Sequence, residues 1–310
     1  MNSGESLPDD SERDEGAARP AGGAMPAFTL TADRAPSLPV LIAVPHAGRA
    51  YPPGLLARMR DPGRTPIRLE DRCVDLLGAA VASRTGAALL VAHAPRALID
   101  LNRAPDDVDW GMIEGGGQAG RGQGRRAGSG LGLIPRRLSG QGELWKQTLP
   151  RADLSARIEQ VHRPYHEALA SQLDELRDRW GAALLLDLHS MPPLGPKHGT
   201  RAAPDFVVGD RFGAACDAGL SALALDHFAR GGRGVAHNRP YAGGYVLDRH
   251  ARPARGIHAM QIEVCRTAYL DRAMREPGTG FAAVADMLAG LVQRLADELP
   301  GTFRLAQAAE

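Results

Sequence analysis

The sequence predicts an α/β protein of three layers, in which helices cover both faces of a mostly parallel, mixed sheet. Short apolar runs that are typical of buried strands alternate along the chain with segments of helical periodicity. Two of these runs, ending at Val44 and Leu188, lead to a histidine, His46 and His189, and then to a loop rich in Gly or Pro. Ligands of open α/β sheets bind outside the carboxyl ends of strands. We therefore expect the two histidines to share one metal or catalytic site.

Strands are expected where short apolar runs are bounded by turn-forming residues. In chain order these are residues 38–44, 87–92, 96–101, 182–188, 205–209 and 257–264. Helices are expected where apolar residues recur at spacings of three and four. They start near residue 71 and recur at residues 153–180, 214–229 and about 284–295.

Two local features modify these predicted elements: a proline inside one helix and a glycine-rich segment. Pro164 lies inside the helix expected at residues 153–180, where its missing N–H should kink or break the helix. Residues 231–244 are rich in glycine and are expected to form a loop. The alternation of strands with helices elsewhere favours parallel pairing, because crossover helices connect parallel strands.

Composition divides the chain into a tail and one domain. Residues 1–25 are rich in Ser, Asp, Glu, Gly and Pro and lack the apolar stretch of a signal peptide, so we expect a disordered N-terminal tail. Residues 26–310 contain no clear linker or internal repeat, and we expect a single domain. Within it, residues 115–132 are dense in glycine and arginine. We expect a mobile surface loop there, with a flap over the site as the alternative.

Charge and cysteine content limit the classes of partner. The 310 residues are 44% hydrophobic and 24% charged, which is ordinary for a soluble globular protein. A net charge of +1 gives no support for a nucleic acid or a membrane as partner. The three cysteines form no CxxC pair, which argues against disulfides and a thiolate zinc site and favours the cytoplasm.

The metal site needs a third ligand beside the two histidines, because catalytic zinc commonly has three protein ligands and one water. Asp71, at the start of a predicted helix, is our choice, although its carboxylate could instead cap that helix. Glu70 beside it is the nearest rival. Asp187 shares a strand face with His189 and could either orient that histidine or ligate the metal itself.

The last predicted strand contains a candidate base. Its apolar residues alternate with Gln261 and Glu263, so the two polar side chains share one face. A carboxylate in such a strand costs free energy unless it is paired or functional. Glu263 is expected to act as a general base that takes a proton from the attacking water. A structural ion pair with Arg266 is an equally open alternative.

Two groups of residues are candidates for substrate contacts. Arg103 follows a predicted strand, where its guanidinium can bind a carboxylate through two hydrogen bonds; an ion pair with Asp106 or Asp107 is the alternative. Arg239 and the Gly243-Gly244 pair form a second expected contact, because adjacent glycines let a ligand approach the backbone. An ordinary turn is the alternative for the two glycines.

His162 and His166 lie four residues apart on the long predicted helix. That spacing suits two metal ligands, but no glutamate occupies the position that an HExxH motif requires. We therefore expect one of the two histidines to contact the sheet and the other to face solvent.

Seven segments, taken together and in this order, resemble the N-formylglutamate amidohydrolase family. They are Val44-Pro45-His46-Ala47-Gly48, Glu70-Asp71-Arg72, Ile99-Asp100-Leu101-Asn102-Arg103, Arg163-Pro164-Tyr165-His166, Asp187-Leu188-His189-Ser190, Asn238-Arg239-Pro240-Tyr241-Ala242-Gly243-Gly244-Tyr245 and His258-Ala259-Met260-Gln261-Ile262-Glu263. The resemblance covers about residues 38–275, and the tail and the Gly/Arg-rich loop lie outside it.

The resemblance implies a fold like that of zinc peptidases and phosphorylase-like hydrolases. It also implies hydrolysis of an N-acyl amino acid, typically N-formyl-L-glutamate to L-glutamate and formate. By this likeness one Zn²⁺ ion is held by His46, Asp71 and His189, and Glu263 is the base. The expected supporting and substrate-binding residues are Asp187 and His166 beside the site, and Arg103, Asn102, Asn238, Arg239, Gly243 and Gly244 against the substrate.

Other functions are weighed against this one. A zinc amidase for a different acyl amino acid or small peptide would have the same site, and a non-catalytic binding protein of the same fold would not need Glu263. A nucleic-acid binder that uses the arginines of residues 115–132 is disfavoured by the small net charge and the lack of interleaved aromatic residues. The sequence does not indicate an oligomeric state.

Overall fold

The computed structural model describes residues 25–32, 36–116, 124–195 and 203–307. The predicted tail, apart from Met25, and residues 117–123 of the predicted Gly/Arg-rich loop therefore lie outside the described residues.

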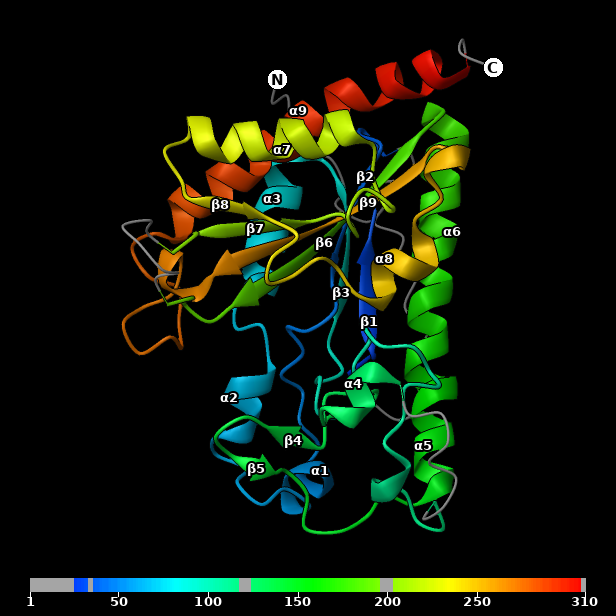
Figure 1. The fold of residues 1–310 in the computed structure, drawn as a ribbon, viewed down its shortest axis with the longest axis vertical. Helices are drawn as coiled ribbons and strands as arrows, with labels where there is room; N and C mark the ends of the chain where they lie inside the picture. The colour runs from blue at the N-terminus through cyan, green and yellow to red at the C-terminus, as the bar shows by residue number, and fades with distance from the viewer. Residues whose placement is uncertain (1–24, 33–35, 117–123, 196–202, 308–310) are drawn as a thin grey trace, which may run out of the picture.

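A seven-stranded sheet in the order β1-β3-β2-β6-β9-β7-β8 forms the centre of the molecule (Figure 1). The strands are β1 (Phe28–Thr31), β2 (Val40–Val44), β3 (Ala88–Ala92), β6 (Ala183–Met191), β7 (Phe206–Gly209), β8 (Val235–His237) and β9 (Ile257–Cys265). The central strands β3, β2, β6 and β9 are parallel, whereas β1 is antiparallel to β3 and β7 is antiparallel to β9. The predicted α/β fold with a mostly parallel, mixed sheet is confirmed.

Helices cover both faces of this sheet, as Figure 1 shows. The helices are α1 (Pro53–Ala57), α2 (Thr65–Leu69), α3 (Val74–Thr85), α4 (Arg125–Gly128), α5 (Arg151–Arg157), α6 (Arg163–Trp180), α7 (Ala218–Arg230), α8 (Tyr245–His250) and α9 (Phe281–Gln307). The helices α3, α7 and α9 pack on one face, where they enclose one hydrophobic core, and α6 packs on the other face over a second core.

Alternation along β6 and β9 decides which side chains reach each core. Leu186 and Met260 point into the core under α3, α7 and α9, whereas Leu185 and Ala259 point into the core under α6. Toward the carboxyl ends of the strands, the face that carries Leu185 and Ala259 continues with polar side chains. The site therefore lies on the α6 face, where the apolar core gives way to polar residues.

A separate group of short elements lies beside the ends of these strands (Figure 1). This lower lobe consists of α1, α2, α4 and the ribbon of β4 (Arg137–Leu138) and β5 (Gly142–Glu143). Its apolar residues, such as Met59 and Leu144, join the core under α6.

Three predicted elements differ from the structure, and one of them is the loop predicted at residues 115–132, whose described part contains the helix α4. Residues 96–101 do not form a strand but a series of turns, because the N–H groups of Leu98 and Ile99 both donate to the carbonyl of Pro95. The alternating apolar residues of this segment are buried all the same, which imitates a strand pattern. The loop predicted at residues 231–244 contains β8, which pairs in parallel with β7.

The long predicted helix does not break at Pro164, but its hydrogen-bonding pattern changes shortly before it. Between α5 and α6 the chain forms a π-helical turn at Ile158–His162, which ends two residues before the proline. Proline has no N–H to donate to the preceding turn, and a π-helical turn accommodates this loss without ending the helix.

None of the helices within the described ranges combines the length and the apolar character needed to cross a lipid bilayer.

Candidate active site

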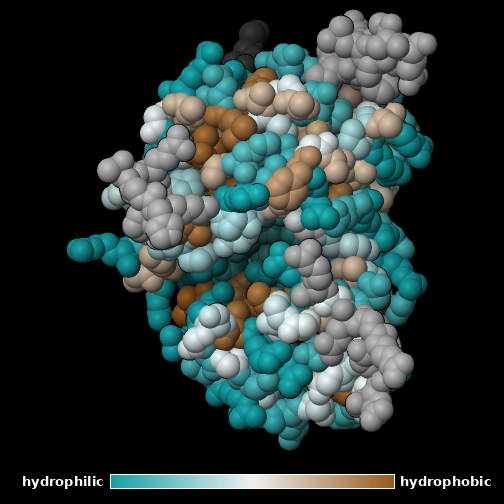
Figure 2. Space-filling view, in the orientation of Figure 1, coloured by the Kyte–Doolittle hydropathy of each residue, from teal (hydrophilic) through white to brown (hydrophobic). Residues whose placement is uncertain are grey.

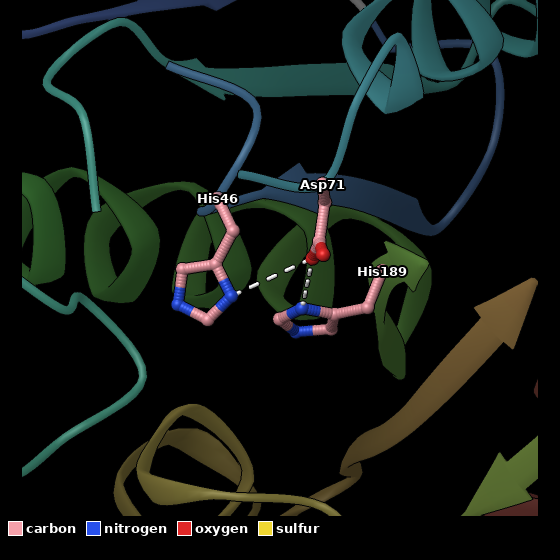
Figure 3. A group of neighbouring side chains, drawn as sticks. All are labelled: His46, Asp71 and His189. Atoms are coloured by element: carbon pink, nitrogen blue, oxygen red, sulfur yellow. Dashed lines mark hydrogen bonds and ion pairs between the residues drawn. The ribbon is translucent and has the colours of Figure 1, made fainter. Parts of the chain in front are cut away.

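His46, Asp71 and His189 meet at the carboxyl ends of β2 and β6, as Figure 3 shows. The Oδ2 atom of Asp71 lies 3.0 Å from His189 Nδ1 and 3.5 Å from His46 Nδ1. All three residues are buried, and their candidate ligand atoms lie within 4.8 Å of one another. A tetrahedral Zn²⁺ ion with bonds of about 2.0–2.1 Å separates its ligand atoms by roughly 3.3 Å. The three side chains therefore form a group that could hold one metal ion.

The local backbone brings Asp71 to the histidines. Its N–H donates to the carbonyl of His46 at 2.8 Å. The helix α3 begins three residues later without a side-chain cap, so the carboxylate of Asp71 does not serve that role. Burial alone would raise the pKa of Asp71, but the hydrogen bonds and charges of His189 and His46 lower it below its ordinary range.

Each site imidazole binds a second buried carboxylate through its other nitrogen. His46 Nε2 lies 2.7 Å from Asp100 Oδ1, and His189 Nε2 lies 2.8 Å from Asp187 Oδ2. An imidazole that donates Nε2–H to a carboxylate keeps an Nδ1 lone pair for a metal and is fixed in orientation. Asp187 thus contacts His189 as an orienting residue would. Asp100 performs the same task for His46, and our sequence reasoning missed it.

Opposite charges in these pairs shift pKa values in spite of burial. Burial would lower the pKa of His189, but Asp187 and Asp71 raise it well above the ordinary value. Burial would raise the pKa of Asp100, but the charges of Arg96 and Arg103 lower it well below the ordinary value. Asp100 is therefore ionised and holds the imidazole of His46 through a charge-assisted hydrogen bond.

The rival ligand Glu70 turns away from the histidines. Its carboxylate accepts a hydrogen bond from Arg72 Nη1 at 2.9 Å, and its carbonyl accepts one from Arg266 Nη2 at 2.5 Å. Within the described part of the chain, the one cluster that could hold a metal contains Asp71 and not Glu70.

Glu263 lies next to the histidines because β6 and β9 pair in register. His189 is the direct partner of Glu263 in that ladder. Burial raises the pKa of Glu263 to about 7, and its Oε1 accepts a hydrogen bond from Gln261 Nε2 at 2.8 Å. Arg266, the alternative partner, donates instead to Ser190 Oγ at 3.1 Å. A carboxyl group with a pKa near neutrality is suited to take and return a proton.

A cavity of about 350 Å³ opens beside these residues. Figure 2 shows a hollow across this face, between the half that contains the sheet and the lower lobe. The cavity is lined by five arginines, which are Arg68, Arg96, Arg103, Arg126 and Arg266. Two carboxylates, those of Asp71 and Glu263, line it as well. The excess of positive charge suits an anionic ligand.

Most of the predicted substrate contacts line this cavity. They are Arg103, Asn102, Gly243 and Gly244. Arg103 donates from Nε to the Leu131 carbonyl at 2.7 Å and from Nη1 to the Asn102 carbonyl at 2.6 Å. A Cβ atom at Gly244 would collide with Oδ1 of Asn102, so this close approach requires glycine.

Asn238 and Arg239 are not among the residues that line the cavity. The amide of Asn238 binds Asp210 instead, accepting from its N–H at 3.0 Å and donating to its Oδ1 at 2.7 Å. Arg239 is exposed. Asn238 therefore shapes the loop before Tyr241, whose side chain lines the cavity and which our sequence reasoning did not single out.

A second histidine cluster lies behind the segment of residues 100–103. His162 Nε2 donates to the Arg103 carbonyl at 2.8 Å, and His166 Nε2 donates to the Leu101 carbonyl at 3.0 Å. The Nδ1 atom of His166 lies 2.9 Å from Nε2 of His250. Both helix histidines are buried, so the prediction that one faces solvent is wrong. The two histidines lie four residues apart, so their rings are neighbours on one side of the helix, with centroids 4.4 Å apart.

This second cluster is electrically unlike the first. Burial, together with neighbouring positive groups, lowers the pKa of His166 to about 2 and that of His250 to about 3. The pKa of His162 is lowered by burial as well. These imidazoles are neutral donors that hold the backbone of residues 101–103.

Comparisons with known proteins identify similar sequences. The sequence profile of the family described as N-formylglutamate amidohydrolase matches residues 38–270. An N-formylglutamate deformylase of Pseudomonas putida is 34% identical over 245 residues, which cover 76% of this chain and 82% of that protein. An N-formylglutamate deformylase of Pseudomonas aeruginosa is 28% identical over 266 residues, which cover 84% of this chain and 92% of that protein.

Solved structures share the fold. The crystal structure of N-formylglutamate amidohydrolase from Ralstonia eutropha JMP134 has a TM-score of 0.77 and 33% sequence identity, and the match covers 88% of this chain and 98% of that chain. A gene product of Agrobacterium tumefaciens, Atu2144, has a TM-score of 0.64 at 18% identity, over 88% of this chain and 96% of that chain. The second likeness concerns the fold alone.

Proposed function

The chain belongs to the N-formylglutamate amidohydrolase family, and from this premise we propose that it hydrolyses the amide bond of N-formyl-L-glutamate in a metal-dependent reaction. The products are formate and L-glutamate. One observation carries the proposal: two imidazole Nδ1 atoms converge on Asp71 beside the buried Glu263, in a cavity lined by arginines. The proposed location is the cytoplasm, for which the argument is that Cys73, Cys216 and Cys265 are all free thiols.

In this proposal His46, Asp71 and His189 hold one Zn²⁺ ion. Two imidazoles and a carboxylate, with one open position, are a ligand set that catalytic zinc sites use. When bound, the cation supplies Lewis-acid polarisation of the scissile carbonyl group and lowers the pKa of water in the site. Asp100 and Asp187 keep the two Nδ1 lone pairs pointed at the cation, because each accepts the Nε2–H of its histidine.

Glu263 carries the proton. It takes one proton from water as the water oxygen attacks the formyl carbon, and it gives that proton to the amide nitrogen as the C–N bond breaks. The water oxygen is thereby retained in formic acid, and the amine of L-glutamate leaves as –NH2. The acid proton then passes to that amine, which gives formate and the ammonium form of L-glutamate. A pKa of about 7 lets Glu263 act in both directions near neutral pH.

The arginines of the cavity bind the negative charge of the substrate. Charge-assisted hydrogen bonds from guanidinium groups to carboxylates are strong and directional. The carboxylates of the substrate do not react, but their contacts with the arginines hold the scissile amide in position for attack. Part of the binding free energy is in this way used to orient the reacting groups. Asn102, Gly243 and Gly244 complete the proposed contact set, while Asn238 and Arg239 are left out of it because neither lines the cavity.

The experiment measures formate release from three compounds by purified protein, before and after chelation and after reloading with Zn²⁺. The compounds are N-formyl-L-glutamate, N-formyl-L-aspartate and N-acetyl-L-glutamate. We expect turnover of N-formyl-L-glutamate that chelation abolishes and Zn²⁺ restores. Cleavage of the acetyl compound alone would assign a different acyl amino acid to the enzyme. Binding of these compounds without cleavage of any of them would make the protein a non-catalytic binder.

A further inference from the structure

The arginines of the cavity differ in how far their hydrogen-bonding capacity is already used. Arg96 donates from Nε to Asp100 Oδ2 at 2.8 Å, so its charge is balanced by a carboxylate. Arg266 donates to Ser190 Oγ at 3.1 Å and lies 3.5 Å from Asp71 Oδ1. These two arginines belong to the framework of the metal ligands.

The two arginines farther from that framework bind mainly carbonyl groups. Arg68 donates from Nη2 to the Ser139 carbonyl at 2.7 Å. Arg103 uses Nε and Nη1 on carbonyls, and its Nη2 lies 3.9 Å from the nearest carboxylate oxygen, Asp100 Oδ2. The outer N–H groups of Arg103 therefore remain available to a ligand.

Arg126 differs from the other four arginines of the cavity in how its guanidinium group is used. It comes from α4 in the lower lobe, whereas the metal ligands lie at the strand ends (Figure 1). Across the residues that the structure describes, its guanidinium makes no hydrogen bond or ion pair with another side chain or carbonyl. It lies near enough to Arg103 that, with burial as the larger cause, its charge helps to lower the pKa of Arg103.

Two guanidinium groups that face one cavity repel each other unless an anion lies between them. A carboxylate has two oxygens that accept hydrogen bonds from both forks at once. The α-carboxylate of an acyl amino acid is one carbon from the scissile nitrogen, so it must stay near the metal ligands. A second carboxylate at the end of the side chain reaches farther, toward the part of the cavity that α4 lines.

We propose that Arg126 and Arg103 form the subsite for the side-chain carboxylate of the substrate, and that Arg126 selects dicarboxylic over neutral acyl amino acids. This subsite rests on the proposed function for the acyl amino acid and adds the residue that determines its side chain.

The test compares two substrates of the same shape, N-formyl-L-glutamate and N-formyl-L-glutamine, in the metal-loaded enzyme and in Arg126→Gln. We expect kcat/KM for N-formyl-L-glutamate to fall about 10-fold, chiefly through KM, because a charge-assisted contact is lost. For N-formyl-L-glutamine the change should stay below about twofold, since its side chain carries no charge. Arg126→Lys should recover part of the loss, because it restores the charge without the fork.

The matched control is Arg230→Gln, which removes an exposed arginine of α7 on the opposite face of the sheet. It should leave both substrates unchanged. An equal loss on the two substrates in Arg126→Gln, or no loss on N-formyl-L-glutamate, overturns the subsite.

A binding measurement separates this subsite from the proposed reaction. Calorimetric titration of the metal-loaded protein with L-glutamate and L-glutamine requires no hydrolysis. A preference for L-glutamate that disappears in Arg126→Gln supports the subsite, and equal affinities in the parent protein overturn it. If the parent protein does not cleave N-formyl-L-glutamate, the proposed function is contradicted. The calorimetric comparison then still decides whether the subsite exists.

Discussion

Two histidine clusters lie on opposite sides of residues 100–103, and they differ in what their ring nitrogens bind. In front of the segment, His46 and His189 each bind one carboxylate through Nε2 and face Asp71 through Nδ1. Behind it, His162 and His166 bind backbone carbonyls. Both clusters are buried, so burial alone does not distinguish a metal ligand from a structural histidine.

The partner of each imidazole makes the difference. A carboxylate stabilises positive charge on the ring or on a metal bound to it, and the pKa of His189 is raised despite burial. A carbonyl supplies too little negative charge to offset burial, and the pKa of His166 falls to about 2. The same residue type therefore belongs to a candidate cation site on one side of the segment, and on the other side it is neutral and binds the backbone.

Removal of a front histidine is expected to have the largest effect. His189→Ala should lose the metal and lower kcat/KM for N-formyl-L-glutamate by about 10³-fold or more, because several kcal/mol of transition-state stabilisation depend on the cation. Metal content by mass spectrometry and initial rates measure the two losses. The control His227→Ala removes a histidine of α7 whose ring contacts the Met287 carbonyl and Arg294 Nη1 and no residue of the site, and it should keep its metal. A full complement of metal in His189→Ala would contradict the ligand assignment.

Glu263→Gln is expected to have the next largest effect. It removes the proton carrier but no metal ligand, so kcat should fall by about 10²–10⁴-fold while the metal content stays unchanged. Glu175→Gln, which changes an exposed glutamate of α6, is the matched control. Activity at the parental rate in Glu263→Gln would remove this residue from the mechanism.

The pKa of Glu263 also predicts the pH dependence. The base must be ionised, so kcat/KM should decline as the pH falls through about 7. A bound cation stabilises the ionised carboxylate, so it should shift this decline of kcat/KM to lower pH and not to higher pH.

In metal-free protein the raised pKa of Glu263 favours its neutral form, so the contribution of Glu263 to stability is lost as the pH rises through about 7. Denaturation of metal-free Glu263→Gln should show a gain in stability over the parent above that pH.

Much of the front cluster could be predicted from the sequence because it follows strand periodicity. His189 and Asp187 share a face of β6, Gln261 and Glu263 share a face of β9, and parallel strands place their carboxyl ends together. Asp71 was chosen over its neighbour from the position of a helix start, and the structure puts its carboxylate 3.0 Å from His189 Nδ1.

Asp100, His162 and two arginines of the cavity could not be predicted in this way. Asp100 lies in turns whose alternation of buried residues imitates a strand, so its side chain had no assigned direction. His162 is the last residue of a π-helical turn, which no periodicity in the sequence marks. Arg68 and Arg126 reach the cavity from the lower lobe, and only the packing of that lobe brings them there.

Asp100→Asn sharpens the comparison by weakening a partner and keeping the ligand. Asparagine has nearly the same shape but no charge, so His46 keeps a hydrogen bond and loses electrostatic support. Metal affinity should fall by about 10–100-fold, as for other residues that orient a ligand. Competition with a chelator measures this affinity. The control Asp153→Asn removes a half-exposed carboxylate that binds Arg58, and it should leave the affinity unchanged. An unchanged affinity in Asp100→Asn would mean that the carboxylate has only a structural role.

The smallest effect is expected behind the segment, where His166→Gln and His166→Ala should both keep the metal. Because the pKa of His166 is lowered to about 2, its neutral form supports the fold above its ordinary pKa, and that support is lost as the pH falls below about 6.5. The loss is on the order of 1.4 kcal/mol per pH unit for one such group. Glutamine keeps an N–H donor for the Leu101 carbonyl and does not titrate, so the free energy of unfolding of His166→Gln should fall less with decreasing pH than that of the parent.

Alanine leaves that carbonyl unpaired, so His166→Ala should lose about 1–3 kcal/mol of stability at any pH. Denaturation curves at pH 8 and pH 5 separate the two effects. Loss of metal from either variant would show that the rear histidines act on the ligands themselves and would erase the distinction between the two clusters.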